Sequence, residues 1–427
     1  MGKEKLEIIS IKDLLEMPLL IPNYQRPYRW TMESASILFD DIYEAINKDI
    51  TEYRIGSVIL HKNKDNKYEI VDGQQRITTL SILLYCLGDC SAILKEKTFN
   101  DLSKKAIIEN YQILKRHCEK IDKEKFKKYL LENCTFVKII VDSEQEAFQF
   151  FDSQNSRGKT LAPQDLLKSY HLREMADNDE NQKIKIVSTW ENENQKELAK
   201  FFEYHLYPLV QWCKGKDGLY YSDKKIKIFK GIKKESIYSY AIYHKAANLY
   251  IENFNHQNLY ELTNSEKIAQ FQLTQPLIAG ERFFYYTHYY FNLYKKILKE
   301  IDKRKTKYEF IFENGTGNSY VKNLFINILI FFVDRFNIKE LNDARFEILC
   351  VWAYSLRIVM HSVYIETINK YALGNHDRID NENLFEKIAQ MQKPQELDNI
   401  ILNKPDKIEE TYKEISEKLF GASNETN

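Results

Sequence analysis

The spacing of apolar residues changes character partway along this chain of 427 residues. Before about residue 175, short apolar runs that favour β-strands, at 54–61, 68–71 and 136–141, alternate with stretches of helical periodicity. After it, nearly every long segment has apolar residues at helical spacing, namely 184–213, 236–255, 281–301, 320–336, 341–372 and 406–420. The pattern predicts an α+β chain, with a mixed α/β domain over residues 1–175 followed by an all-α helical domain over residues 176–427.

A β-hairpin and a buried helix are predicted in the middle of the first domain. The β-type runs 54–61 and 68–71 flank a polar turn, which is the arrangement of a hairpin. From Ile77 to Leu87, apolar residues recur at helical spacing. The pentapeptide DGQQR, residues 72–76, therefore stands where a strand leads into the N-terminus of a helix.

Residues 72–76 combine features that suit an anion. The first N–H groups of a helix lack intrahelical partners and the helix dipole is positive at that end, which favours a phosphate. Gly73 lets the backbone approach a ligand closely, and Arg76 can add a bidentate, charge-assisted contact. An ordinary strand–turn–helix, in which Arg76 pairs with a carboxylate, is the simpler interpretation of these residues alone.

The segment YQRPYRW, residues 24–30, interleaves aromatic rings with guanidinium groups. Pro22 and Pro27 keep this segment extended and out of any central strand. Side chains alternate on an extended chain, so Gln25 and Arg29 would share one face, and the other face would carry Tyr24, Arg26, Tyr28 and Trp30. Such a face suits stacking on a base and contact with phosphate. An aromatic edge packed on the domain is an equally good interpretation.

A third polar segment, FDSQNSRGKTLAPQDLLK at 151–168, links two predicted helices. Asn155 and Gly158 can adopt the left-handed backbone of a tight loop. Asp165 falls in the first turn of the helix that begins near Pro163, where a carboxylate interacts favourably with the helix dipole. An ordinary loop that connects two helices accounts for these residues equally well.

Composition limits the classes of function. Lys and Arg total 62 and Asp and Glu total 62, so no wholesale affinity for nucleic acid is predicted. The six cysteines form no CxxC pair, which indicates buried free thiols in a reducing compartment. The N-terminus is too polar for a signal peptide, and the longest apolar run, 324–333, is too short to span a bilayer. A cytoplasmic protein without a membrane partner is therefore expected.

Positive charge is nevertheless concentrated in one segment of the helical domain. Residues 214–234 carry eight lysines against two aspartates, with Tyr220, Tyr221 and Phe229 interleaved. Salt-dependent DNA binding would follow from phosphate contacts by Lys224, Lys225, Lys227, Lys230, Lys233 and Lys234. A solvated lysine-rich loop is the common alternative for such a charge run. The aromatic helix at 281–294 is expected to pack against other helices rather than to stack on bases.

Three of these segments occur in a recognisable order. IPNYQRPYRW, VDGQQRITTL and FDSQNSRGKTLAPQDLLK resemble the three signature blocks of the GmrSD-type N-terminal domain family, and the resemblance covers residues 5–175. That family belongs to type IV, modification-dependent restriction and related anti-phage systems. Its fold is similar to the ParB/sulfiredoxin superfamily, whose members bind a nucleotide at the strand-to-helix turn. The resemblance therefore implies a ParB/sulfiredoxin-like, nucleotide-binding first domain.

The resemblance also implies roles for individual residues. The family's DGQQR nucleotide motif is occupied by Asp72, Gly73, Gln74, Gln75 and Arg76. Of these, Asp72, Gln75 and Arg76 would be catalytic, with Asp72 orienting a metal-bound water or Mg²⁺, and Gly73, Gln74 and Arg76 would bind an NTP. The other blocks would add nucleotide contacts from Tyr24, Gln25, Arg26, Asn155, Gly158 and Asp165. Sulfiredoxins have their reactive cysteine at the position of Gln74, so sulfinic-acid repair is excluded.

The function implied is anti-phage defence, in which the chain binds and hydrolyses an NTP and senses DNA, in particular modified phage DNA. Fused relatives carry a C-terminal HNH nuclease, but His361, His376 and Asp377 stand isolated here. A separate nuclease subunit is therefore expected as a partner. The identity of the NTP, the DNA modification and the oligomeric state, a homo-oligomer included, stay open. Two alternatives remain: a nucleotide-gated DNA-binding or regulatory module without turnover, and a nuclease of unfamiliar motif within the helical domain.

Overall fold

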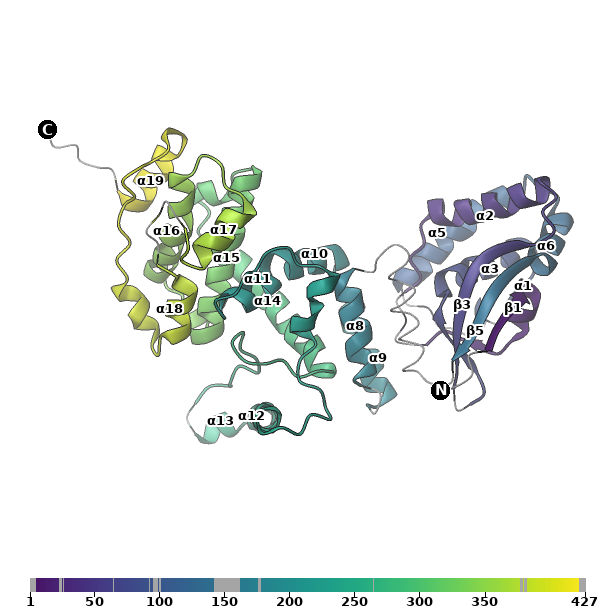
Figure 1. The fold of residues 1–427 in the computed structure, drawn as a ribbon, viewed down its shortest axis with the longest axis horizontal. Helices are drawn as coiled ribbons and strands as arrows, with labels where there is room; N and C mark the ends of the chain where they lie inside the picture. The colour runs from purple at the N-terminus through teal and green to yellow at the C-terminus, as the bar shows by residue number, and fades with distance from the viewer. Residues whose placement is uncertain are drawn as a thin grey trace. The chain divides into compact units, whose positions relative to one another are not determined.

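The structure is a computed structural model (Figure 1) that describes residues 5–22, 25, 27–63, 65–91, 93–94, 99, 101–141, 162–175, 178–263, 265–376, 379 and 382–421. Contacts along the chain divide it into two compact units. The first comprises Met1–Leu161 and Met175–Asn192, and the second comprises Ala162–Glu174 and Glu193–Asn427, so the chain passes between the units three times. A five-stranded sheet in the first unit and helices in the second confirm the predicted α+β class.

The first unit is built on a mixed sheet with the strand order β1-β5-β3-β4-β2. Its strands are β1 (Lys5–Ser10), β2 (Leu19–Leu20), β3 (Tyr53–Lys62), β4 (Tyr68–Asp72) and β5 (Cys134–Val141). Strands β3 and β4 pair antiparallel, which confirms the predicted hairpin, whereas β3 and β5 run parallel. The sequence of β5, CTFVKIIV, is a nearly continuous apolar run because a central strand with a parallel neighbour is covered on both faces.

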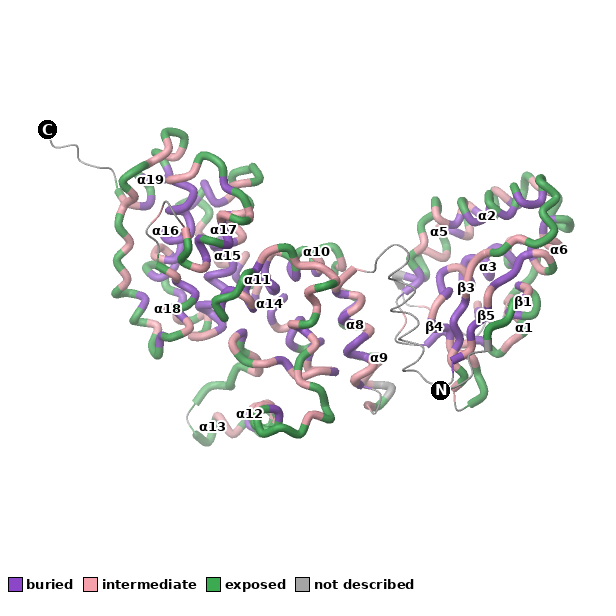
Figure 2. Tube along the Cα trace, viewed as in Figure 1, coloured by how far each residue is buried: buried purple, intermediate pink, exposed green. Residues whose placement is uncertain are grey.

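Helices pack around this sheet (Figures 1 and 2). They are α1 (Ile11–Glu16), α2 (Met32–Asn47), α3 (Gln74–Cys86), α5 (Asp101–Cys118) and α6 (Lys123–Glu132). Helix α9 (Glu180–Asn192) also belongs to the first unit. Side-chain caps set where two of them begin: Thr31 accepts the Ser34 N–H before α2, and Asp122 caps α6. Helix α3 is buried on nearly every side and packs against α5. The position of its N-terminus, where DGQQR lies, is therefore fixed by the core.

A buried hydrogen-bond network ties the extended segment 27–30 to α3 and α5. The Tyr28 hydroxyl lies 2.8 Å from Thr79 Oγ1 and accepts a hydrogen bond of 2.8 Å from Asn110 Nδ2. Asn110 Nδ2 also donates to the Trp30 carbonyl at 2.7 Å, and the Tyr28 N–H donates to Ser103 Oγ at 2.9 Å. Burial raises the pKa of Tyr28 to about 12, so the phenol stays neutral. Tyr28 and Trp30 thus pack on the domain, as the second interpretation of this segment expects.

The second unit is helical throughout its ordered elements. Its helices are α8 (Pro163–Arg173), α10 (Gln195–Phe201), α11 (Tyr207–Trp212), α12 (Ser239–His256), α13 (Leu259–Leu262), α14 (Glu281–Lys303), α15 (Thr316–Phe336), α16 (Asp343–Val359), α17 (Ile365–Ala372), α18 (Leu384–Gln390) and α19 (Lys413–Phe420). A π-helical turn, Phe202–Leu206, joins α10 to α11. The periodic stretch 341–372 forms two helices, because the chain is extended at Met360, where Arg357 Nη1 donates to the Met360 carbonyl at 2.8 Å.

Helix α15 is the centre of the second unit. It is buried from Val321 to Asp334 on most sides and packs against α14, α16, α17 and α18. In its one buried amide, Asn327 Oδ1 accepts the Nδ1–H of His205 at 2.8 Å, and Nδ2 donates to the Tyr204 carbonyl at 3.0 Å. Burial lowers the pKa of His205 to about 4, so this histidine is neutral and its role is structural.

Helix α8 is anchored in the second unit by His171. Its Nδ1 accepts the Gly280 N–H at 3.1 Å, and its Nε2 lies 2.9 Å from the Phe229 carbonyl. The ring stacks on Phe283 with the ring centres 3.9 Å apart. Burial lowers the pKa of His171 to about 3, which agrees with a neutral ring that accepts at Nδ1 and donates at Nε2.

Tyr28→Phe is expected to lower the free energy of unfolding of the first unit by about 1–2 kcal/mol, because it removes the shared partner of Thr79 and Asn110 in a dry environment. Chemical denaturation, with hydrogen-exchange protection of the α3 amides as the local probe, measures the change. Tyr85→Phe is the matched control, since the Tyr85 side chain is exposed and its loss of a hydroxyl should stay within about 0.5 kcal/mol. Equal stabilities of the two variants would contradict the role of the network.

Candidate functional site

The DGQQR segment forms the strand–turn–helix that its sequence predicts. Strand β4 ends at Asp72, and α3 begins at Gln74. Between them Gly73 is the N-cap residue with φ 95° and ψ 0°, a left-handed conformation that favours glycine. Since glycine offers no side chain to cap the helix, the first-turn N–H groups of α3 are available to a ligand at the positive end of the helix dipole.

Arg76 occupies the space left by a missing side chain on β3. A Cβ atom at Gly56 would lie 2.0 Å from Arg76 Nη1, so only glycine lets the guanidinium rest on this strand. The guanidinium carbon is 5.9 Å from the centre of the Phe136 ring. Arg76 Nη2 lies 3.5 Å from Asp72 Oδ2, which is longer than a strong charge-assisted hydrogen bond. The two side chains are 24% and 33% exposed, so an incoming anion can reach the cation.

The side-chain amide of Gln75 holds the extended segment 27–30 against the first turn of α3. Gln75 Oε1 accepts the Arg29 N–H at 2.8 Å, and its Nε2 donates to the Pro27 carbonyl at 3.2 Å. Gln74 is buried beside it, with Gln74 Oε1 3.5 Å from the Gln75 nitrogen. Both ends of the Gln75 amide are therefore engaged by backbone groups, which is a positioning role for this predicted catalytic residue.

Gln25 brings the first motif to the end of β4. Its Nε2 donates to the carbonyl oxygens of Val71, at 2.8 Å, and Ile70, at 3.2 Å. The residues directly before Asp72 are therefore in contact with the segment that carries Pro27 and Arg29. Two of the three sequence motifs meet at the turn.

A carboxylate that sequence reasoning missed completes this side of the turn. Arg29 Nη2 lies 3.0 Å from Glu191 Oε2 on α9, and the Glu191 side chain is only 7% exposed whereas that of Arg29 is 39% exposed. Helical periodicity predicts the helix around Glu191, but no motif marks this glutamate. The pair places α9 beside the motif segment within the first unit.

Other predicted nucleotide-binding residues lie elsewhere. Tyr24, Arg26, Asn155 and Gly158 are outside the described residues. Asp165 is in the first turn of α8, as predicted, and α8 belongs to the second unit. Among the described residues, the candidate site of the first unit therefore consists of Gln25 and residues 72–76, with Gly56 and Arg29 as added neighbours.

The predicted DNA-binding lysines divide into two groups. Lys224, Lys227 and Lys230 follow one another at three-residue spacing along η2 (Asp223–Phe229), a 3₁₀ helix, and at its C-cap, so they share one face. Lys224 and Lys227 are exposed and form no ion pair with any residue that the structure describes. Lys230 Nζ lies 4.9 Å from the centre of the Tyr170 ring.

The remaining lysines of this segment are engaged within the unit. Lys225 Nζ donates to the Leu219 carbonyl at 2.6 Å, and Lys233 Nζ lies 3.8 Å from Glu174 and 3.3 Å from Glu235. The Lys234 carbonyl accepts from Lys245 at 2.6 Å. The contacts of Lys225 and Lys233 order the segment, and among the six predicted DNA-binding lysines they leave Lys224 and Lys227 exposed without an ion pair to any described residue.

The interleaved aromatic residues of the segment are mostly part of the core. Phe229 is buried and Tyr221 is half-buried beside the ring of Phe202. Exposed tyrosines instead follow after the lysines, just before α12 and along it. Tyr238 is 79% exposed and Tyr243 is 70% exposed, and the other members of this exposed set are Tyr240 and Tyr250. The sequence showed the lysine cluster but not which rings face outward.

Comparison with known families yields two matches. Residues 10–172 match the GmrSD restriction endonuclease, N-terminal domain, and residues 182–417 match a family of unknown function, DUF7834. The first match contains all three motifs and confirms the resemblance drawn from them. No curated protein matches the sequence. None of the helices in the described ranges is long and apolar enough to cross a membrane.

Gly56→Ala is expected to destabilise the first unit more than Gly88→Ala. Both glycines have positive φ, 148° and 91°, so both substitutions strain the backbone, but nothing lies within 4 Å of a Cβ at Gly88. The excess should be about 0.5–1.5 kcal/mol in denaturant titrations, because the end of the flexible Arg76 side chain must shift to a less favourable rotamer.

The cause can be tested by a double-mutant cycle. In an Arg76→Ala background the extra cost of Gly56→Ala over Gly88→Ala should vanish. If the excess persisted, the destabilisation by Gly56→Ala would not come from a clash with the Arg76 guanidinium.

Proposed function

Because the chain belongs to the family of unknown function DUF7834 and carries a GmrSD-type N-terminal domain, we propose that it is a restriction-type defence protein that binds and hydrolyses an NTP and senses foreign DNA. The observation that carries the proposal is the turn at residues 72–76, where a left-handed glycine, an uncapped helix N-terminus and a seated arginine converge. Modified phage DNA is the proposed target, and a separate subunit supplies the nuclease.

The chain's own groups account for phosphate binding. The N–H groups at the start of α3 donate to phosphate oxygens, and Gly73 leaves room for their approach. Arg76 exchanges its long contact with Asp72 for a bidentate contact to phosphate. Asp72, released and one-third exposed, is then placed to orient a water molecule toward the phosphate.

The residues present also fit Mg²⁺. Mg²⁺ in nucleotide sites is usually held by one or two carboxylates together with substrate phosphates, and Asp72 is the carboxylate at this turn. When bound, the ion would neutralise charge that develops on the phosphates. Within the described residues no cluster of three or more His, Cys, Asp or Glu could hold a metal ion by protein ligands alone. In this proposal the ion arrives with the nucleotide.

A route for coupling nucleotide binding to the rest of the chain starts at Gln75. Its amide holds Pro27 and Arg29, and the Arg29 side chain pairs with Glu191 near the end of α9. The chain leaves the first unit directly after α9. A change at the turn would therefore reach the segment that connects the units. In this proposal the change alters the arrangement of the two units and thereby activates the nuclease subunit.

DNA binding is supported by the lysine row and its neighbouring rings. Lys224 and Lys227 offer charges for phosphate contacts, which are the main source of affinity for DNA. Exposed tyrosines follow later in the chain, from Tyr238 along α12, and Lys245 Nζ ties α12 to the carbonyls of Lys234 and Ser236 at 2.6 and 2.7 Å. Tyrosine rings of this kind stack on unpaired bases.

A second candidate function, a nucleotide-gated DNA-binding or regulatory module without turnover, is favoured by one observation. Gln75 is committed to backbone contacts, which leaves Asp72 as the single carboxylate and no free amide to position an attacking water. Such a module would bind an NTP and change its DNA affinity without releasing phosphate.

Arg76→Ala is expected to weaken NTP binding roughly 10–100-fold, since a charge-assisted contact is worth about 1.5–3 kcal/mol. Arg76→Lys should restore only part of the affinity, because lysine cannot make the bidentate contact. Calorimetric titration with ATP, GTP, CTP and UTP measures binding, and phosphate release with and without modified DNA measures turnover. Arg116→Ala, an exposed arginine on α5, is the matched control.

Three results would be decisive. Unchanged NTP affinity and phage protection in the Arg76→Ala variant would exclude the turn as the nucleotide site. Tight binding without phosphate release under any condition would favour the module. Phosphate release that depends on Arg76 but not on Arg116 would support the enzyme.

Replacing Lys224 and Lys227 by alanine should weaken DNA binding and reduce the slope of log K against log salt concentration by up to about 2, roughly 0.9 for each lost phosphate contact. Filter binding or anisotropy at several salt concentrations measures the slope. Replacement of Lys413 and Lys418 on α19 removes the same charge elsewhere in the second unit and should leave the slope unchanged. Identical slopes for both double variants would place the DNA interface away from η2.

A further inference from the structure

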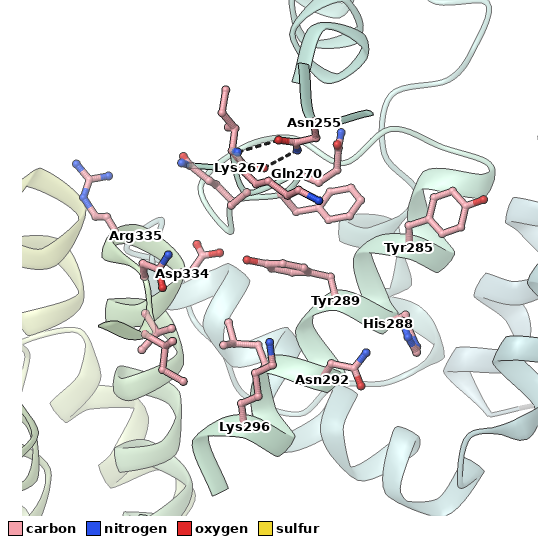
Figure 3. Close-up of a pocket in the computed structure, with 18 of the residues that line it drawn as sticks. Asn255, Lys267, Gln270, Tyr285, His288, Tyr289, Asn292, Lys296, Asp334 and Arg335 are labelled. Atoms are coloured by element: carbon pink, nitrogen blue, oxygen red, sulfur yellow. Dashed lines mark hydrogen bonds between the residues drawn. The ribbon is translucent and has the colours of Figure 1, made fainter. Parts of the chain in front are cut away.

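The second unit contains a large cavity that the proposed nucleotide and DNA sites do not use. Its volume is about 890 Å³, within the range of small-molecule sites. It lies between α14, the end of α15 and the irregular segment 265–272, with Glu252 and Asn255 of α12 at its edge (Figure 3).

One stripe of α14 forms a wall of this cavity. Tyr285, Tyr289, Asn292 and Lys296 line it at spacings of four, three and four residues, which places them on one face of the helix. The neighbouring stripe of α14 is the buried core face, so the helix packs as its sequence predicts while this second stripe remains open. Two tyrosines, an amide and a lysine on an open face offer stacking, hydrogen bonds and charge.

The opposite wall is an irregular segment that side chains hold in place. Asn255 makes two hydrogen bonds to the backbone of Ile268, donating to its carbonyl at 2.8 Å and accepting its N–H at 2.9 Å. Gln270 Nε2 donates to the Asn248 carbonyl at 3.2 Å, and Asp334 Oδ2 accepts the Leu273 N–H at 2.9 Å. Three anchors in so short a stretch make this wall pre-organised, which lowers the entropic cost of binding a ligand.

The charge of the cavity is positive. Glu252 is paired with Arg282, and His288 with Glu193. Among the described residues, Lys267 and Lys296 form no ion pair with a carboxylate, and Arg335 has the Coulombic attraction of Asp334 but no ion pair; all three line the cavity. Lys267 rests 5.4 Å from the centre of the Tyr260 ring, and Arg335 donates to the Met391 carbonyl, so neither charge is neutralised.

The remaining carboxylate, Asp334, offsets this charge only in part. Asp334 is fully enclosed, and its Oδ1 accepts the Tyr290 hydroxyl at 2.6 Å while its Oδ2 accepts the Leu273 N–H. Burial raises the pKa of Asp334 to about 7, so near neutral pH a large part of this group is uncharged. An anion entering the cavity meets cations on both walls.

We propose that this cavity binds a nucleoside phosphate, with the base against Tyr289 and the phosphate between Lys267 and Lys296. In Figure 3 the Tyr289 ring lies between the two walls, with Lys267 and Gln270 on one side and Asn292 and Lys296 on the other. The ring is steadied by Phe271, whose centre is 5.8 Å away at 61°. A base stacks on such a ring, and amides of the Asn and Gln type pair with base edges.

The ligand is either a free nucleotide or a nucleotide of a DNA strand, since both present the same base and phosphate. The site is separate from the turn at 72–76 and does not depend on NTP binding there. Substitutions at Arg76 and at Lys296 therefore report on the two sites independently.

Titration calorimetry of the full-length chain with the four 2′-deoxynucleoside 5′-monophosphates tests the proposal, in wild-type and Arg76→Ala backgrounds. Lys296→Ala should weaken monophosphate binding roughly 10-fold or more in both backgrounds, because a charge-assisted contact is lost. Lys299→Ala, an exposed lysine one turn along α14 that does not line the cavity, should change nothing. The fold is expected to survive both substitutions because both side chains are exposed.

Further probes separate the parts of the ligand. Tyr289→Leu should weaken unphosphorylated deoxynucleosides and monophosphates alike, whereas Lys296→Ala should weaken only the monophosphates. Competition with a single-stranded 12-nucleotide DNA identifies the source. If the DNA displaces the monophosphate from the wild type but not from Lys296→Ala, the ligand is a nucleotide of a strand. If the DNA displaces no monophosphate from the wild type, the ligand is a free nucleotide. No monophosphate binding at millimolar concentration in the Arg76→Ala background, equal effects of Lys296→Ala and Lys299→Ala, or binding of inorganic phosphate alone would overturn the proposal.

Discussion

The contact on which the candidate site depends is the side-chain amide of Gln75. Segment 27–30 has no regular secondary structure, so its backbone groups lack partners from a helix or sheet. The oxygen and the nitrogen of the Gln75 amide supply two such partners. The same segment sends Tyr28 into the core and Arg29 to Glu191. One buried amide therefore connects the turn at residues 72–76 with the core and with α9, and the loop cannot shift without breaking the hydrogen bonds of this amide.

The local features of this site could be predicted, and the non-local ones could not. Turn chemistry and periodicity predict the hairpin, the left-handed Gly73 and the start of α3, because each depends on a few neighbouring residues. Simple alternation assigned Tyr28 to a stacking face, but burial of the ring determined its direction. Nothing in the sequence marks Gly56, because its role is to leave space, through its lack of a side chain, for an arginine twenty residues later in the chain.

In the second unit the same limit applies to charge and to shape. A run of lysines is visible in the sequence, but in the structure Lys225 and Lys233 make contacts within the unit, whereas Lys224 and Lys227 are exposed. The stripe of α14 that lines the cavity looks like an ordinary solvent face, because its opposing wall is an aperiodic segment held by side-chain hydrogen bonds. Periodicity identifies the buried face of a helix but does not show which segment lies opposite its polar face.

The path of the chain between helices α8 and α9 has a consequence for how this protein can be divided. The family match that ends at residue 172 stops inside α8, and α8 belongs by packing to the second unit, where His171 stacks on Phe283. Helix α9, which supplies Glu191 to the first unit, begins only after that match has ended. A fragment cut at the family boundary would therefore carry most of α8 without the residues that cover its buried side chains, and it would lack the carboxylate that Arg29 pairs with. The boundary of the family match in this chain therefore differs from the boundaries of its compact units.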